Sequence, residues 1–170
     1  MVEGPITRIA PAMNPPATQA DPVLRLCDVL RETAFAMHGY LRHGHLEKVY
    51  ENGLAGRLRR QGLVVQQQFP LQVLDQDGTR LGDYYADLVV EGFLIVEIKA
   101  VRRLAEEHFA QILGYLRASR IRHGLLINFG GPRLEIRKLV LGGANDGGVW
   151  AGEEPLAMER TRTARDPGVN

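Results

Sequence analysis

The chain has 170 residues, of which 45% are hydrophobic, and 21 basic against 20 acidic side chains give a formal net charge of +1. This length suits one soluble domain with one core, and a net charge near zero by itself neither indicates nor excludes nucleic-acid binding. The single cysteine excludes an internal disulfide, no apolar run reaches the roughly 18 residues of a membrane span, and no signal peptide is recognisable, so we expect a cytoplasmic protein.

The domain is expected to begin at Asp21, after a proline- and alanine-rich leader over residues 1–20 that adds little to the fold. Asp21 is a favourable N-cap, and Pro22 follows at the first helical position. Apolar residues then recur at spacings of three and four up to Leu41, which predicts an amphipathic helix of about 20 residues. Cys27 lies on this apolar stripe and is expected to be buried rather than nucleophilic.

A second amphipathic helix is expected over residues 46–61, ended by Gly62. Glu47 and Glu51 lie one turn apart at the edge of its apolar stripe. The spacing alone favours the interpretation that both are solvated acids on the helix flank, with a functional role as the alternative.

From residue 63 the periodicity becomes strand-like, and turn residues divide the rest of the chain into short elements. The predicted elements are an antiparallel meander over 63–74, 81–90 and 93–100, a helix over 104–119, and strands over 122–129 and 134–141. We therefore predict one α/β domain over residues 21–141 with the element order ααβββαββ. Residues 142–170 are polar and glycine-rich at their start, and we expect a loose tail there.

Three charged residues, Asp87, Glu97 and Lys99, stand in the otherwise apolar hairpin over residues 84–100. A buried charge costs several kcal/mol unless it is paired or bound to a metal. The alternative is an ordinary Glu97–Lys99 ion pair on an exposed strand, with Asp87 an edge residue. The apolar residues around Glu97 favour a central, buried strand instead.

The loop of this hairpin decides whether the two carboxylates share a face of the sheet. A two-residue turn at residues 91–92 would place Asp87 and Glu97 on opposite faces, because side chains alternate along a strand. A three-residue connection over residues 90–92, with Gly92 left-handed, places both acids and Lys99 on one face and leaves the other face apolar. We predict this second register.

Two such carboxylates can hold one or two hard cations such as Mg²⁺, with the carbonyl oxygen of Ile98 as a neutral ligand. The ion would activate a water and stabilise charge as a phosphodiester is attacked, and Lys99 would orient that water or offset phosphate charge.

Four motifs together resemble the GxxExxY family, a compact branch of the PD-(D/E)xK nuclease superfamily. They read GHLEKVY at 44–50, YAD at 85–87, VEIKA at 96–100 and HFAQ at 108–111 with Tyr115 and Leu116. The resemblance spans about residues 29–141 and implies a restriction-endonuclease-like core, with a mixed central sheet of about five strands flanked by three helices.

The resemblance also implies roles for individual residues. Asp87 and Glu97 would ligate Mg²⁺, which Mn²⁺ can replace, Lys99 would position the attacking water, and Glu47 would contribute from its helix. The expected catalytic residues are Asp87, Glu97, Lys99, Glu47 and Gln111, the expected metal ligands Asp87, Glu97, Ile98 and Glu47, and the expected phosphate contacts Tyr115, His108, Arg102 and Arg103. His108 has the alternative of a helix-end residue hydrogen-bonded into the fold, and the arginines that of ordinary solvated surface.

The expected function is Mg²⁺-dependent hydrolysis of nucleic acid, with DNA favoured over RNA. The alternative is a non-catalytic nucleic-acid-binding or accessory protein that keeps the nuclease fold. No membrane partner is expected, and the sequence leaves a homodimer open.

Overall fold

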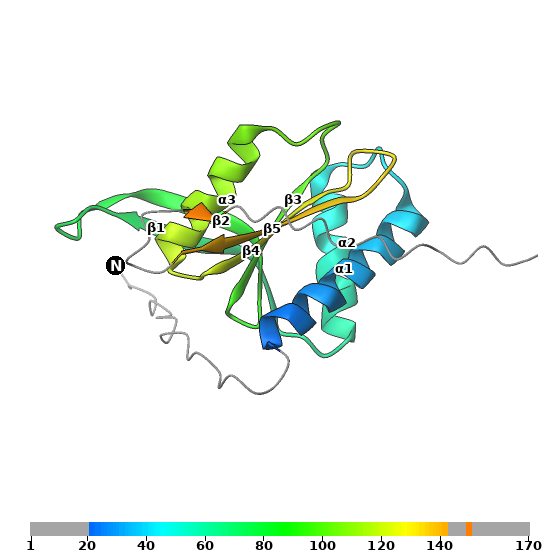
Figure 1. The fold of residues 1–170 in the computed structure, drawn as a ribbon, viewed down its shortest axis with the longest axis horizontal. Helices are drawn as coiled ribbons and strands as arrows, with labels where there is room; N and C mark the ends of the chain where they lie inside the picture. Colours follow the sequence, from blue (N-terminus) through cyan, green and yellow to red (C-terminus); the bar gives the residue numbers. More distant parts are fainter. Residues whose placement is uncertain (1–20, 143–148, 151–170) are drawn as a thin grey trace, which may run out of the picture.

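The structure is a computed structural model that describes residues 21–142 and 149–150 (Figure 1). The expected leader and most of the expected tail therefore lie outside the described residues. The elements are α1 (Pro22–Leu41), α2 (Glu47–Arg60), β1 (Val65–Leu74), β2 (Arg80–Val90), β3 (Leu94–Lys99), α3 (Glu106–Ser119), β4 (His123–Asn128), β5 (Glu135–Leu141) and β6 (Val149–Trp150). None of these helices is long and apolar enough to cross a membrane.

The strands form one sheet in the order β1-β2-β3-β4-β5-β6, which is also their order in the chain. The β3–β4 pair is parallel and the other pairs are antiparallel, so the sheet is mixed. Parallel neighbours need a crossover connection, and α3 supplies it between β3 and β4. The predicted α/β class and the order ααβββαββ are confirmed, and β6 adds a two-residue strand at the edge.

Two apolar cores lie on the two faces of this sheet. The first packs α1 and α2 against Leu88, Val96 and Ile98, and the second packs α3 against Val89 and Ile95. Alternate residues of β2 and β3 thus enter opposite cores, as strand geometry requires. The separation is visible in Figure 1, where α3 and the α1–α2 pair lie on different sides of the strands.

The first helix begins and ends close to where the sequence predicts. The Asp21 carboxylate accepts a hydrogen bond from the Val23 amide at 2.9 Å, and Pro22 occupies the first turn. Arg42 follows the helix with φ 62, a left-handed value that stops its propagation. Cys27 is buried on the core side, as expected.

The β2–β3 hairpin has the predicted three-residue loop length, but the predicted position is wrong by one residue. Val90 pairs with Leu94, so the loop comprises residues 91–93 rather than 90–92. Gly92 is left-handed as predicted, with φ 74, and Glu91 is left-handed too, with φ 53. The shift has a physical reason: Glu91 is bonded to Val64 through its amide at 2.9 Å and its carboxylate at 2.6 Å.

Continued one residue beyond the Leu88–Val96 pair, this register places Asp87 opposite Glu97. The β1–β2 ladder has a gap at the same level, because Gln67 pairs with Leu88 and Phe69 with Ala86, with no pair between them. Gln68, in the gap, has φ 49. Val65 lies in the α1–α2 core whereas Phe69 packs against the α3 core, so the strand changes the face it presents near Gln68.

The segments that follow β3 and β4 are held against each other. The Asn128 side-chain oxygen accepts hydrogen bonds from the Val101 amide at 3.1 Å and the Gly130 amide at 3.0 Å. A Cβ atom added at Gly130 would overlap the backbone of Ala100 and Val101. Only glycine therefore permits this close approach.

We predict that Gly130→Ala lowers the free energy of unfolding by about 3 kcal/mol, because neither backbone segment can move away without breaking the Asn128 contacts. Gly82→Ala is the matched control, since a Cβ there meets no atom within 4 Å. Urea unfolding of both variants measures the difference. Equal stabilities for the two variants would show that the β3 end is not held in this way.

Candidate active site

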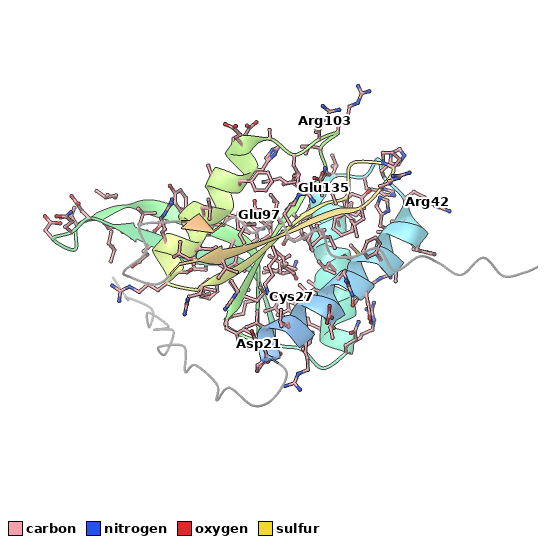
Figure 2. The ribbon with its side chains drawn as sticks, viewed as in Figure 1. Asp21, Cys27, Arg42, Glu97, Arg103 and Glu135 are labelled. Carbon is pink, nitrogen blue, oxygen red and sulfur yellow. The ribbon has the colours of Figure 1, made fainter. Side chains whose placement is uncertain are left out.

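The charged residues of the central hairpin meet at the end of β3. Glu97 is 2% exposed and Lys99 is 8% exposed, and Asp87 on the neighbouring strand β2 is half-buried. Ile98 lies between the two β3 charges with its side chain buried in the α1–α2 core. Figure 2 labels Glu97 near the middle of the domain in this view.

Each of these three charged groups has a hydrogen-bond partner, but one of the carboxylate oxygens has none. Lys99 Nζ donates to Glu97 Oε1 at 2.8 Å. Asp87 Oδ2 accepts from the Ile98 amide at 2.8 Å, and its Oδ1 accepts from the Gln68 amide group at 3.2 Å. Glu97 Oε2 is buried and receives no hydrogen bond from the described residues. A buried carboxylate oxygen without a donor is costly, which makes it a candidate ligand atom.

Burial and mutual repulsion oppose ionisation of both acids. Burial raises the pKa of Glu97 from 4.5 to about 7, the Asp87 charge adds to this shift, and Lys99 opposes it. The pKa of Asp87 is also raised, mainly by burial, with the charges of Glu51 and Glu47 adding to it. Burial is the largest single influence on the pKa of Lys99 and lowers it, but the hydrogen bond to Glu97 and the charges of Glu97, Glu47 and Asp87 together outweigh burial and raise that pKa. The site therefore holds a charged lysine beside carboxylates that a further cation would stabilise.

The donor set fits a hard divalent cation. The acidic side chains at the site offer carboxylate oxygens, which are the ligand atoms that Mg²⁺ prefers. One of these is Glu97 Oε2, which has no hydrogen-bond partner among the described residues. Across residues 21–142 and 149–150, no three His, Cys, Asp or Glu side chains lie close enough to form a complete metal centre. The arrangement thus suits an ion that keeps several waters and takes few protein ligands.

Glu47 and Glu51, on α2, differ more than their spacing indicates. Glu47 is exposed, and its Oε2 accepts from the amide of Ala100, one residue past Lys99, at 3.3 Å. Glu51 is 3% exposed, so its interpretation as a solvated flank acid is wrong. The reason is tertiary, because α2 packs against β1 and brings glutamine side chains onto Glu51.

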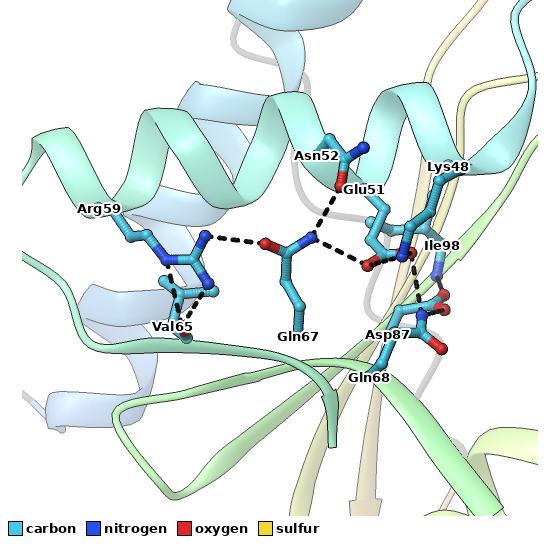
Figure 3. A network of polar contacts seen from close by, with 9 residues as sticks. All are labelled: Lys48, Glu51, Asn52, Arg59, Val65, Gln67, Gln68, Asp87 and Ile98. Carbon is cyan, nitrogen blue, oxygen red and sulfur yellow. Dashed lines mark hydrogen bonds and ion pairs between the residues drawn. The ribbon is translucent and has the colours of Figure 1, made fainter. Parts of the chain in front are cut away.

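Sequence reasoning missed two glutamines of β1 that join this site (Figure 3). Gln67 and Gln68 each donate a hydrogen bond to Glu51 at 3.0 Å, and Gln68 also reaches Asp87. Lys48 Nζ forms an ion pair with the same carboxylate, 2.7 Å from Glu51 Oε1. The only local signal is the run of three glutamines at 66–68, which interrupts the apolar alternation of a strand.

The α3 side of the site holds Gln111 and Tyr115. Gln111 Nε2 donates to the Tyr115 hydroxyl at 2.6 Å, and the Tyr115 ring contacts Tyr84 with centroids 5.4 Å apart. The pKa of Tyr115 is raised by burial first and by the Glu97 charge second. Tyr115 therefore lies within electrostatic reach of the carboxylates.

The remaining predicted phosphate contacts are less closely tied to the carboxylates. His108 Nδ1 accepts from the Ala105 amide at 2.9 Å, which gives it the helix-end role that was the alternative interpretation. Arg102 and Arg103 are exposed in the loop after β3, and Figure 2 shows Arg103 extending away from the body of the domain. Phosphate binding by these three residues stays a prediction.

The mixed sheet, the crossover helix and the Asp87–Glu97–Lys99 group define a restriction-endonuclease-like α/β domain. The model of the PD-(D/E)XK nuclease superfamily matches residues 25–139, and the chain belongs to this superfamily. The crystal structure of SSO0001 is similar with 18% identity and a TM-score of 0.45, over 68% of this chain and 59% of that one. The chain thus spans 59% of the length of that protein. A search of curated proteins found no match.

We predict that Glu97→Gln stabilises the metal-free protein at pH 8 by about 3 kcal/mol, since each pKa unit corresponds to about 1.4 kcal/mol. The folded pKa of about 7 lies above the ordinary 4.5, so ionised Glu97 lowers stability above pH 7. The cost develops as the pH rises from 4.5 to 7 and is mostly lost at pH 4.5, where Glu97 is protonated in the folded state and half protonated in the unfolded state. The glutamine can still accept a bond from Lys99.

Urea unfolding without divalent ions at pH 8 and pH 4.5 measures the effect. Glu107→Gln, at an exposed acid in the first turn of α3, is the control and should change stability little at either pH. A Glu97→Gln effect that is the same at both pH values would contradict the raised pKa.

Proposed function

We propose that this chain is a Mg²⁺-dependent nuclease that hydrolyses phosphodiester bonds, with DNA favoured over RNA and Mn²⁺ able to replace Mg²⁺. The observation that carries the proposal is the buried group of Asp87, Glu97 and Lys99, in which Glu97 Oε2 lacks a donor. Membership of the PD-(D/E)XK nuclease superfamily supports the same chemistry. The proposed catalytic unit is the domain over residues 21–141.

In this proposal Asp87, Glu97 and the Ile98 carbonyl hold the ion, and Glu47 contributes from the start of α2. The bound ion would lower the pKa of a water and offset charge on the phosphate. The Lys99 ammonium orients the attacking water or balances the phosphate charge, and its raised pKa keeps it protonated for that role. Gln111 acts as a catalytic residue near the phosphate, beside Tyr115, to which it is hydrogen-bonded.

The substrate contacts complete the proposal. Tyr115, His108, Arg102 and Arg103 bind the phosphate backbone. His108 lies in the first turn of α3 and Tyr115 further along that helix, and the two arginines follow Ala100 and Val101 in the exposed loop after Lys99. Guanidinium groups suit this role because they bind phosphate oxygens in pairs.

We further propose that the chain belongs to the GxxExxY branch. Its motif at residues 44–50 has structural support: Gly44 has φ 109, and Glu47 reaches the amide of Ala100. Tyr50 donates to the Arg42 carbonyl at 2.7 Å and stacks on Phe129 with centroids 4.6 Å apart. The motif thus fixes the start of α2 against the end of the sheet. A cytoplasmic location and a homodimer stay predictions from the sequence.

We predict that Asp87→Asn and Lys99→Met each reduce Mg²⁺-dependent cleavage by at least about 100-fold while the fold is retained. Cleavage is measured on single- and double-stranded DNA and on RNA, with Mg²⁺, Mn²⁺ or EDTA. Asp83→Asn removes an exposed β2 acid that pairs with Arg80 and should retain full activity. Wild-type activity on no substrate, or full activity of Lys99→Met, would contradict the proposal.

The second candidate is a non-catalytic nucleic-acid-binding or accessory protein. The Lys99–Glu97 ion pair favours it, because it neutralises both groups without any ion. Calorimetry with Mn²⁺ separates the two candidates. Nucleic-acid binding without Mn²⁺ binding supports the second, whereas Mn²⁺ binding that Asp87→Asn removes supports the nuclease.

A further inference from the structure

We propose that Gln68 and Glu51 are positioning residues, which hold the Asp87 carboxylate in the orientation that cation binding needs. This inference deepens the proposed function and rests on it. In the network of Figure 3, the Gln68 amide group lies between two carboxylates on different elements, Glu51 of α2 and Asp87 of β2.

Glu51 is the fixed end of this network. It is 3% exposed, and four hydrogen bonds of 2.7–3.0 Å reach its two oxygens from Lys48, Gln67 and Gln68. A buried carboxylate with this many donors has little freedom to rotate. It thus offers a rigid acceptor above the β1–β2 ladder.

Gln68 carries the constraint from Glu51 to Asp87. Its Nε2 donates to Glu51 Oε2 at 3.0 Å and to Asp87 Oδ1 at 3.2 Å, which uses both amide hydrogens. Its backbone has φ 49, a strained value for a residue other than glycine inside a strand. The gap in the β1–β2 ladder falls at this residue, so its side chain reaches Asp87 where no backbone pair is made.

Asp87 is consequently held at both oxygens, by Gln68 at Oδ1 and by the Ile98 amide at Oδ2. Two donors on different oxygens fix the plane of a carboxylate. Both donors are uncharged, so Asp87 keeps its full negative charge toward a cation. A lysine or arginine in place of Gln68 would neutralise that charge, whereas the amide orients the ligand and leaves it available.

The alternative is that the network only ties α2 to β1. Gln67 provides the matched control, because it also donates to Glu51 at 3.0 Å and is hydrogen-bonded to Asn52 and Arg59, but it makes no hydrogen bond to Asp87. Gln67→Ala therefore weakens the same attachment without releasing Asp87. The test variants are Gln68→Ala and Gln68→Gly, and the glycine relieves the strained φ, so that loss of folding does not obscure the result.

The first measurement is amide hydrogen exchange at Ile98, relative to Val96 in the same strand, without any metal. If Gln68 holds Asp87, both Gln68 variants speed Ile98 exchange by about tenfold while Gln67→Ala leaves it unchanged. Unchanged Ile98 exchange in both Gln68 variants, or an equal increase in Gln67→Ala, would overturn the proposal.

The second measurement is calorimetric titration of the full chain with Mn²⁺. The Gln68 variants are expected to bind about tenfold more weakly than the wild type, and Gln67→Ala within about twofold of it. Equal affinities for Gln68→Gly and wild type would overturn the positioning role. If wild-type protein binds no Mn²⁺, the proposed function fails, and the metal-free exchange at Ile98 separately decides whether Gln68 holds Asp87.

Discussion

The burial of Glu97 and Lys99 at the end of β3 is the constraint on which the rest of the structure depends. Charged groups stay in an apolar sheet only when nearby donors and acceptors replace water. Lys99 and Glu97 do this for each other over 2.8 Å, and the Ile98 amide does it for Asp87. One oxygen, Glu97 Oε2, is left without a donor among the described residues. The scaffold thus stabilises the site incompletely, as expected where binding energy is reserved for a ligand.

The scaffold places these charges by joining segments that are distant in the chain. The parallel β3–β4 pair and its crossover helix α3 bring Tyr115 toward Glu97 on one face of the sheet. On the other face, Tyr50 of α2 stacks on Phe129, which follows β4. This packing sets the start of α2, from which Glu47 reaches the chain just past Lys99. Substituting a residue in either core is therefore expected to act on the site through element positions.

Glu51 is a third carboxylate, itself buried, which acts on Asp87 without contacting it through a hydrogen bond of its own. It raises the pKa of Asp87 through its charge, yet it is held away from Asp87 by the neutral amide of Gln68. An added negative charge nearby strengthens attraction for a cation, while the amide prevents the acids from sharing a proton directly. Electrostatics and orientation are in this way supplied by different residues.

The sequence by itself determined the element order, the Asp21 cap, the three-residue hairpin loop and the grouping of Asp87 with Glu97, because each follows from local periodicity or turn chemistry. Only the tertiary structure decided that Glu51 is buried and that Gln68 reaches Asp87. The position of the hairpin loop was also decided by the tertiary structure, since the Val64 amide donates a hydrogen bond to the Glu91 carboxylate. These three outcomes depend on contacts between residues far apart in the chain, and local patterns carry no information about such contacts.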